Sequence, residues 1–147
     1  MDADLYVVNV EAAVWREGRY LMVVRGAGEE IAPGTLTPPG GKVEGRGAAQ
    51  DVLEQTLRRE VREETGVEVE DAMAYVESHA FEAAGVTVVD VVMLARYRAG
   101  RERVDDDGEV AAVEWLTLDE ILSDERAMPW TRETMRRADA RRLELGW

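Results

Sequence analysis

Long apolar segments separated by short polar breaks fill the first part of the chain. Residues 5–15 are apolar at almost every position, which is typical of a strand that is buried on both faces. The triplet Arg16-Glu17-Gly18 predicts a tight turn, so residues 19–25 are expected to pair with the first strand as a hairpin. Residues 26–41 are rich in glycine and proline and therefore predict a loop.

Beyond residue 66 the pattern again favours strands, and the longest apolar run is residues 86–97. A turn at residues 82–85 precedes this run, and the polar residues 98–108 predict a solvated loop after it. The strands expected in this half of the chain are residues 67–69, 72–79, 86–97 and 111–116.

Between these two groups of strands, the apolar positions recur with the period of a helix. Leu53, Leu57 and Val61 fall along one stripe at about 3.6 residues per turn. We expect the helix to begin between Ala48 and Asp51 and to end at Gly66, because glycine readily takes the left-handed conformation that follows a helix.

Two further helices are expected near the C-terminus. Thr117 is a suitable N-cap for a short helix over residues 118–122, and a last helix is expected from residues 128–130 to about residue 143. The apolar or long side chains of the last helix include Met135, Ala138 and Leu143. Strands on both sides of a central helix, followed by late helices, predict a mixed sheet between helices in one domain spanning residues 1–147.

The central helix carries three carboxylates at positions i, i+3 and i+4, which places them on one face. Glu60 and Glu64 border the apolar stripe and Glu63 lies beside it, so these groups are drawn toward the protein. A buried carboxylate without a partner is costly, and either Arg59 and Arg62 or a hard divalent cation could neutralise the cluster. A solvated acidic face is the alternative interpretation of the same pattern.

The segment from Gly40 to Val67 resembles the Nudix box. The pattern of that box is Gly, five residues, Glu, seven residues, then Arg-Glu-aliphatic-any-Glu-Glu-any-Gly-aliphatic. Residues 59–67 match the second half at every specified position, and residues 40–44 are similar to the Gly-Gly-Lys-aliphatic-Glu opening of the family.

One departure from the Nudix pattern lies before the helix. Nine residues separate Gly41 from Asp51, which stands in the place of the first Glu, so residues 45–50 contain four additional residues. We expect this loop to bulge or to lengthen the start of the helix. The role of Asp51 stays open.

The resemblance implies a Nudix-type α/β/α sandwich, an α/β fold with a mixed β-sheet, in a MutT-like or ADP-ribose pyrophosphatase-like protein. It extends over most of the chain, because residues 108–110, 114–116 and 119–121 are similar to the late strand and helix of the family. Members of the family hydrolyse a nucleoside diphosphate that is linked to another group.

The same resemblance implies a metal site and its ligands. Glu60, Glu63 and Glu64 are expected to ligate Mg²⁺, with Mn²⁺ as a substitute, and the carbonyl of Gly41 is a further ligand. Mg²⁺ suits carboxylates and phosphates alike, since both offer oxygen ligands. Glu63 and Glu64 are also expected to take part in catalysis, and Arg59 to orient the carboxylates through charge-assisted hydrogen bonds.

Further roles follow from the resemblance outside the helix. Lys42 and Glu44 are expected to contact substrate, although Lys42, the only lysine, could equally be a surface residue. Glu109 stands six residues before Trp115, which is the spacing of the general base in MutT-like relatives. The glutamates of the helix are the alternative base.

His79 and three aromatic residues are weaker candidates for a functional role. His79, the only histidine, is better explained as a polar residue at the end of a strand. Phe81, Tyr20 and Trp130 could stack on a base, but each is more typical of a core or a rim.

Composition excludes several classes of protein. The formal net charge is -13, which disfavours binding to nucleic acid through a basic surface. Cysteine is absent, and we find no signal peptide and no run of about 20 apolar residues. We therefore expect a cytoplasmic protein with a small nucleotide substrate, no membrane and no nucleic acid as partners, in the form of a monomer or homodimer.

The substrate is the least determined property. A nucleoside triphosphate, oxidised forms included, is slightly favoured, with products monophosphate and pyrophosphate. ADP-ribose or a nucleotide sugar is the alternative, although Ala83 stands near the place where relatives specific for ADP-ribose often have proline. A non-catalytic nucleotide sensor on the same fold is the alternative from another class of protein.

Overall fold

The computed structural model describes residues 3–45 and 47–147, which form a seven-stranded mixed sheet and three helices. The strands are β1 (Val7–Arg16), β2 (Arg19–Arg25), β3 (Leu36–Thr37), β4 (Gly40–Lys42), β5 (Glu68–Ala83), β6 (Val86–Ala99) and β7 (Val110–Leu116). The helices are α1 (Val52–Thr65), α2 (Leu118–Ser123) and α3 (Pro129–Leu145).

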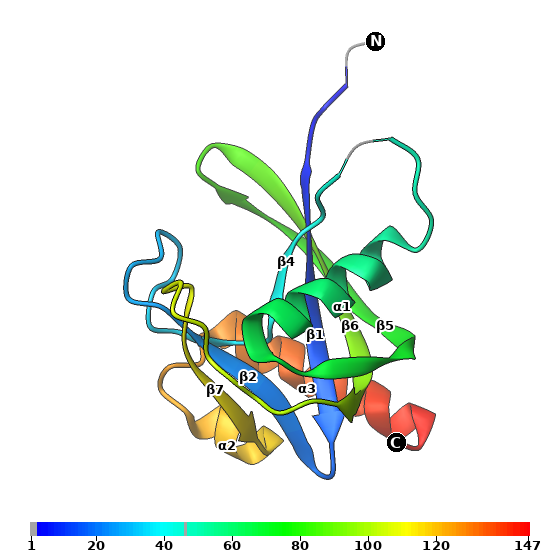
Figure 1. Cartoon of the computed structure of the whole chain (residues 1–147), viewed down its shortest axis with the longest axis vertical. Coiled ribbons are helices and arrows are strands. Elements are labelled where there is room, and N and C mark those ends of the chain that lie inside the picture. The colour runs from blue at the N-terminus through cyan, green and yellow to red at the C-terminus, as the bar shows by residue number, and fades with distance from the viewer. Residues whose placement is uncertain (1–2, 46) are drawn as a thin grey trace.

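The centre of the sheet is β1, which has a different partner on each side (Figure 1). It runs parallel to β6, while on its other edge it pairs with β2 near the hairpin and with β4 near its own start. Gly40 permits the pairing with β4, because a Cβ there would collide with the backbone carbonyl of Val10. This close approach brings the Gly-Gly turn to the middle of the sheet.

Helices cover both faces of the sheet, and each face has its own core. On one face Leu57 and Val61 of α1 are fully buried against β1 and β6. On the other face Ile121 of α2 and Met135 and Ala138 of α3 are fully buried. Each large buried side chain contributes about 1.5–3 kcal/mol through loss of apolar surface from water. The arrangement confirms the α/β/α sandwich with a mixed sheet that the sequence predicts.

The central helix follows its prediction closely. It ends before Gly66, which is left-handed at φ 78° and donates its N–H to the carbonyl of Arg62. It begins only at Val52, so the additional residues of the loop do not lengthen it. Asp51 stands at the N-cap with φ 53°, and its side chain makes no capping hydrogen bond. Residue 46 of this loop lies outside the described part of the chain.

The strands differ from the prediction in three places. The two strands predicted at residues 67–69 and 72–79 are one continuous strand, β5, which begins at Glu68 and whose pairing with β6 contains register shifts. His79 therefore lies inside a strand rather than at its end. Leu5 and Tyr6 are exposed and precede β1. The short strands β3 and β4 were missed, because a segment rich in proline and glycine carries no strand pattern.

The C-terminal helices agree with expectation at their caps. The hydroxyl of Thr117 accepts from the N–H of Glu120, whose carboxylate in turn accepts from the N–H of Thr117. In α3, Met135 and Ala138 are buried as predicted, whereas Leu143 is 63% exposed. None of the helices in residues 3–45 and 47–147 is long and apolar enough to cross a membrane.

Candidate active site

Helix α1 places two of its glutamates against the Gly-Gly turn. A Cβ added at Gly41 would lie 2.6 and 2.7 Å from the two carboxylate oxygens of Glu60, so an added methyl group would push that carboxylate aside. The backbone of Gly40 hydrogen-bonds to Glu64. The turn and the helix therefore form one unit, in which the glutamate side chains of α1 lie against the backbone of β4.

Arg59 ties the helix to the strand. Its guanidinium Nη2 lies 3.1 Å from Oε1 of Glu60 and also donates to the backbone carbonyl of Lys42, at 3.3 Å. A charge-assisted hydrogen bond of this kind fixes the direction of a carboxylate. Arg59 is thus placed to orient Glu60, as the sequence predicts.

The carboxylates of this unit carry unusual pKa values. Burial, followed by the neighbouring charge of Glu60, raises the pKa of Glu64 to about 8, although the Gly40 backbone opposes the shift. Burial also raises the pKa of Glu60, and Arg59 opposes that shift. Acidic groups crowded together in a partly buried place favour a cation between them.

Glu109 joins the site from the loop before β7. Partial burial, then the charges of Asp107, Glu29 and Glu63, raise its pKa, and its own charge contributes to the raised pKa of Glu64. The loop is anchored because its carbonyl at Glu109 accepts from the N–H of Gly26 at 2.9 Å. The structure therefore brings the predicted base close to the helix glutamates.

Glu63, Lys42 and Glu44 are exposed at the edge of the same unit. The charge of Glu44 contributes to the raised pKa of Glu60, which shows that the two groups are close. Over residues 3–45 and 47–147, no three His, Asp or Glu side chains are gathered so that they could hold a metal ion.

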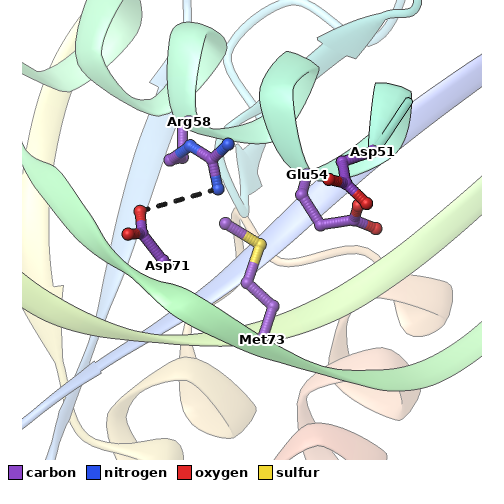
Figure 2. A pocket seen from close by; sticks show the side chains of 5 residues that line it. All are labelled: Asp51, Glu54, Arg58, Asp71 and Met73. Carbon is purple, nitrogen blue, oxygen red and sulfur yellow. Dashed lines mark ion pairs between the residues drawn. The ribbon is translucent and has the colours of Figure 1, made fainter. Parts of the chain in front are cut away.

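Asp51 lies away from this unit. It is nine residues before Glu60, or about two and a half helical turns, which places the two residues on opposite sides of α1. Figure 2 shows Asp51 and Glu54 lining a groove between α1 and β5, where Arg58 forms an ion pair with Asp71 at 3.8 Å. The structure therefore separates Asp51 from Glu60 and Glu64.

Arg25 is a positively charged residue near the glutamates of α1 that the sequence analysis did not predict. The charge of Arg25, at the end of β2, opposes the raised pKa of both Glu64 and Glu109. Its Nε donates to the carbonyl of Ile31 at 2.8 Å, and its Nη2 lies 3.3 Å from Glu29. The available signal was a basic residue directly before the glycine-rich loop.

Sequence reasoning also missed a polar cluster on β1 and β6. Asn9 and Glu11 interrupt the apolar run of β1, and Asp90 interrupts that of β6. Burial, then the charge of Asp90, raises the pKa of Glu11 well above its ordinary value, and the charge of Glu64 adds to the shift. This cluster therefore lies close to the glutamates of α1.

Comparison with known proteins identifies the family of this chain. A model of the NUDIX domain matches residues 5–138 of the chain. The chain belongs to the Nudix family. It is a Nudix hydrolase, MutT-like, and acts on phosphoric anhydride bonds. A comparison with curated proteins gave no significant match.

Solved structures share the fold over nearly their whole length. The MutT NUDIX hydrolase from Burkholderia pseudomallei is 26% identical with a TM-score of 0.75, covering 91% of this chain and 98% of that chain. The E. coli ORF135 protein is 27% identical with a TM-score of 0.69, covering 95% and 94%. A C. elegans Ap4A hydrolase is 19% identical with a TM-score of 0.69, covering 96% and 99%, and shows the fold alone.

These comparisons establish the class of chemistry and leave its details to the site. Nudix hydrolases bind small nucleotide substrates and generally use divalent metal ions. The solved neighbours include a MutT protein, a UDP-X diphosphatase and an Ap4A hydrolase, so this fold serves diverse substrates.

Proposed function

We propose that this protein is a Mg²⁺-dependent pyrophosphohydrolase, formed by one domain over residues 1–147. Its substrate is a nucleoside triphosphate, oxidised forms included, and its products are the monophosphate and pyrophosphate. The observation that carries this proposal is the partly buried pair Glu60 and Glu64 beside the Gly-Gly turn, close enough to Glu109 and Arg25 for their charges to act on Glu64.

The donor set of this place fits a hard divalent cation. Glu60, Glu63 and Glu64 offer carboxylate oxygens, Gly41 offers its backbone carbonyl, and Mg²⁺ prefers oxygen ligands. Bound there, Mg²⁺ or its substitute Mn²⁺ would supply Lewis-acid stabilisation of charge on phosphoryl oxygens. The absence of a side chain at Gly41 leaves the Glu60 carboxylate room to turn.

The other residues of the site would position substrate and water. Glu109 is proposed as the base that takes a proton from the attacking water, since its raised pKa brings it nearer to the working pH. Arg59 holds Glu60 in place. Lys42 and Glu44 are exposed where β4 leaves the turn, and we assign them to substrate contacts.

The choice of substrate rests on the likeness to the MutT NUDIX hydrolase from Burkholderia pseudomallei. ADP-ribose or a nucleotide sugar stays the second candidate, because one solved neighbour is a UDP-X diphosphatase. We further propose a cytoplasmic protein that acts on free nucleotides without nucleic acid or membrane, as a monomer or homodimer.

A hydrolysis panel tests the proposal directly. It contains dNTPs, 8-oxo-dGTP, ADP-ribose, NADH and diadenosine polyphosphates, each measured with Mg²⁺ and with EDTA. We expect Mg²⁺-dependent turnover of a nucleoside triphosphate, and we expect Glu63→Gln or Glu64→Gln to lower it at least about a hundredfold. The reason is that the neutral amide of glutamine lacks the negative charge with which the glutamate carboxylate binds the cation.

Glu54→Gln is the matched control, because Glu54 lies on the same helix but lines the groove toward β5. We expect this variant to keep its rate within about twofold of wild type. Undiminished activity in EDTA, or a Glu64→Gln variant as fast as Glu54→Gln, would refute the metal assignment. Turnover of ADP-ribose alone would replace the proposed substrate by the second candidate.

A further inference from the structure

A row of polar side chains crosses the sheet beside the candidate active site. Asn9 on β1 is the register partner of Lys42 on β4 and of Asp90 on β6, and Asp90 is in turn the partner of His79 on β5. Residues paired directly across neighbouring strands point to the same face of a sheet. Asn9, Asp90 and His79 are called the polar row below.

The polar row lies on the face that α3 covers further along the sheet. Ala13 and Leu94 follow Asn9 and Asp90 by an even number of residues, so they share that face. Both belong to the core that contains Met135 of α3. The polar row therefore lies on the same face of the sheet as the core residues against which α3 packs.

Helix α3 does not extend over the row. Near its N-terminus, Thr134 donates to the carboxylate of Glu77 at 2.6 Å, and nearer its C-terminus, Arg141 donates to the carbonyl of Tyr75 at 3.3 Å. The helix therefore runs along β5 away from His79, whose side chain is 39% exposed. Figure 1 shows the β5–β6 hairpin projecting beyond α3.

The middle of the row contains an unsatisfied acceptor. Asp90 is 1% exposed, and its Oδ1 accepts from the amide Nδ2 of Asn9 at 2.6 Å. Its Oδ2 is buried and has no hydrogen-bond partner among the residues that the structure describes, with Nε2 of His79 at 3.5 Å. A buried carboxylate oxygen without a donor is costly. Within the chain, Glu11 hydrogen-bonds to Asp90 and supplies a donor only while Glu11 is protonated, so a ligand that brings its own donor can take over this role.

The row starts at the turn where the phosphates are proposed to bind. Neighbouring strands are about 4.8 Å apart, so Asp90 on β6 lies roughly 10 Å from Lys42 on β4, with one strand between them. The sugar of a nucleotide is bonded directly to its phosphate, and the base lies further away. A substrate with its phosphates at the turn would therefore bring its base, rather than its sugar, to Asp90.

We propose that the polar row recognises the base of the substrate, with Oδ2 of Asp90 accepting a hydrogen bond from an exocyclic amino group. The row would then select cytosine over uracil and adenine over hypoxanthine, because each second base has a carbonyl where the first has the amino group. His79 and the 42% exposed Phe81, whose ring centroids are 6.2 Å apart, provide surfaces on which the base can stack. This inference rests on the proposed hydrolysis of a nucleotide.

The test compares two pairs of substrates that differ only in this group. We measure kcat/KM for CTP against UTP and for ATP against ITP, and we titrate CMP, UMP, AMP and IMP by calorimetry to obtain Kd without turnover. We expect the amino member of at least one pair to be preferred about 10- to 100-fold. A ratio within about twofold of one for both pairs would overturn the inference.

Asp90→Asn gives the inference a sharper test. In this variant the amide oxygen takes the hydrogen bond from Asn9, so the NH₂ group stands where Oδ2 stood. A donor at that place favours a carbonyl, and we expect the preference to turn toward UTP or ITP. Glu82→Gln, which changes an exposed carboxylate on the neighbouring strand β5, is the control and should keep the wild-type ratio.

The outcomes separate this inference from the proposed function. Glu64-dependent hydrolysis without a base preference, or a folded Asp90→Asn protein with the wild-type ratio, overturns the role of the polar row alone. Tighter binding of CMP and AMP than of UMP and IMP, without hydrolysis of any triphosphate, supports the row and refutes the proposed function. The wild-type ratios decide the matter even if Asp90→Asn does not fold, since they need no variant.

Discussion

Gly41 shows how one residue without a side chain makes room for chemistry. Most glycines in turns are explained by a positive φ, but Gly41 is not among the residues with that conformation. Its requirement comes instead from the Glu60 carboxylate, which occupies the place of a Cβ. The sequence pattern Gly-Gly therefore has two causes here, namely the approach of β1 to Gly40 and the approach of Glu60 to Gly41.

We predict that Gly41→Ala lowers turnover at least about tenfold, because its Cβ would push the Glu60 carboxylate away from the turn and from Arg59. Steady-state kinetics at saturating metal would measure the effect, and the melting temperature would report any loss of stability. Gly28→Ala is the matched control, since nothing lies within 4 Å of an added Cβ there. Equal rates for the two variants would show that Glu60 does not depend on this space.

At the scale of the element, α1 divides its charged residues between two sides. Glu60 and Glu64 face β4, whereas Asp51 and Glu54 line the groove toward β5. The longer loop before the helix ends at Asp51, so its acid stands at the cap of the helix and not at the site. The departure from the Nudix pattern therefore does not separate Glu60 and Glu64 from the turn at β4.

We predict that Asp51→Asn changes kcat and KM by less than about twofold, because Asp51 is exposed and lies about two and a half turns from Glu60. Steady-state kinetics with the best substrate of the panel would measure this. Glu64→Gln, assayed in parallel, shows that the assay can detect the loss of a carboxylate. A large decrease for Asp51→Asn would contradict the separation of Asp51 from Glu60 and Glu64.

At the scale of the whole molecule, buried and crowded carboxyl groups dominate the electrostatics. Burial raises the pKa of Glu11, Glu60, Glu64, Asp90 and Glu109. A carboxyl whose pKa is higher in the folded state than in the unfolded state stabilises the fold below its unfolded pKa. That stability is lost as the pH rises toward the folded pKa, which for Glu64 is about 8.

We predict that the metal-free protein becomes less stable as the pH rises from about 5 to about 8.5. Melting temperatures in EDTA across this range would measure the change, and Glu64→Gln should show a smaller slope than Glu54→Gln because its amide does not titrate. Added Mg²⁺ should raise the melting temperature more at high pH, where Glu64 is ionised. A melting temperature that is constant or rises with pH in EDTA would contradict the raised pKa values.

The sequence alone determined the elements that have their own local signal. The end of α1 at Gly66, the hairpin of β1 and β2, and the capping box at Thr117 depend on residues close together in the chain. The three glutamates of α1 were predictable for the same reason, since helical spacing fixes their common face. The predicted sandwich and the Nudix family were both confirmed.

Only the tertiary structure decided which distant residues meet. No local pattern marks β4 as a strand, and its pairing with β1 brings Gly40 beside Val10 and the turn beside Glu60. The unsatisfied Oδ2 of Asp90 is likewise a property of three strands together, because Asn9 and His79 come from its two neighbours. A sequence lists polar residues on each strand, but the register between strands determines which of them share a row.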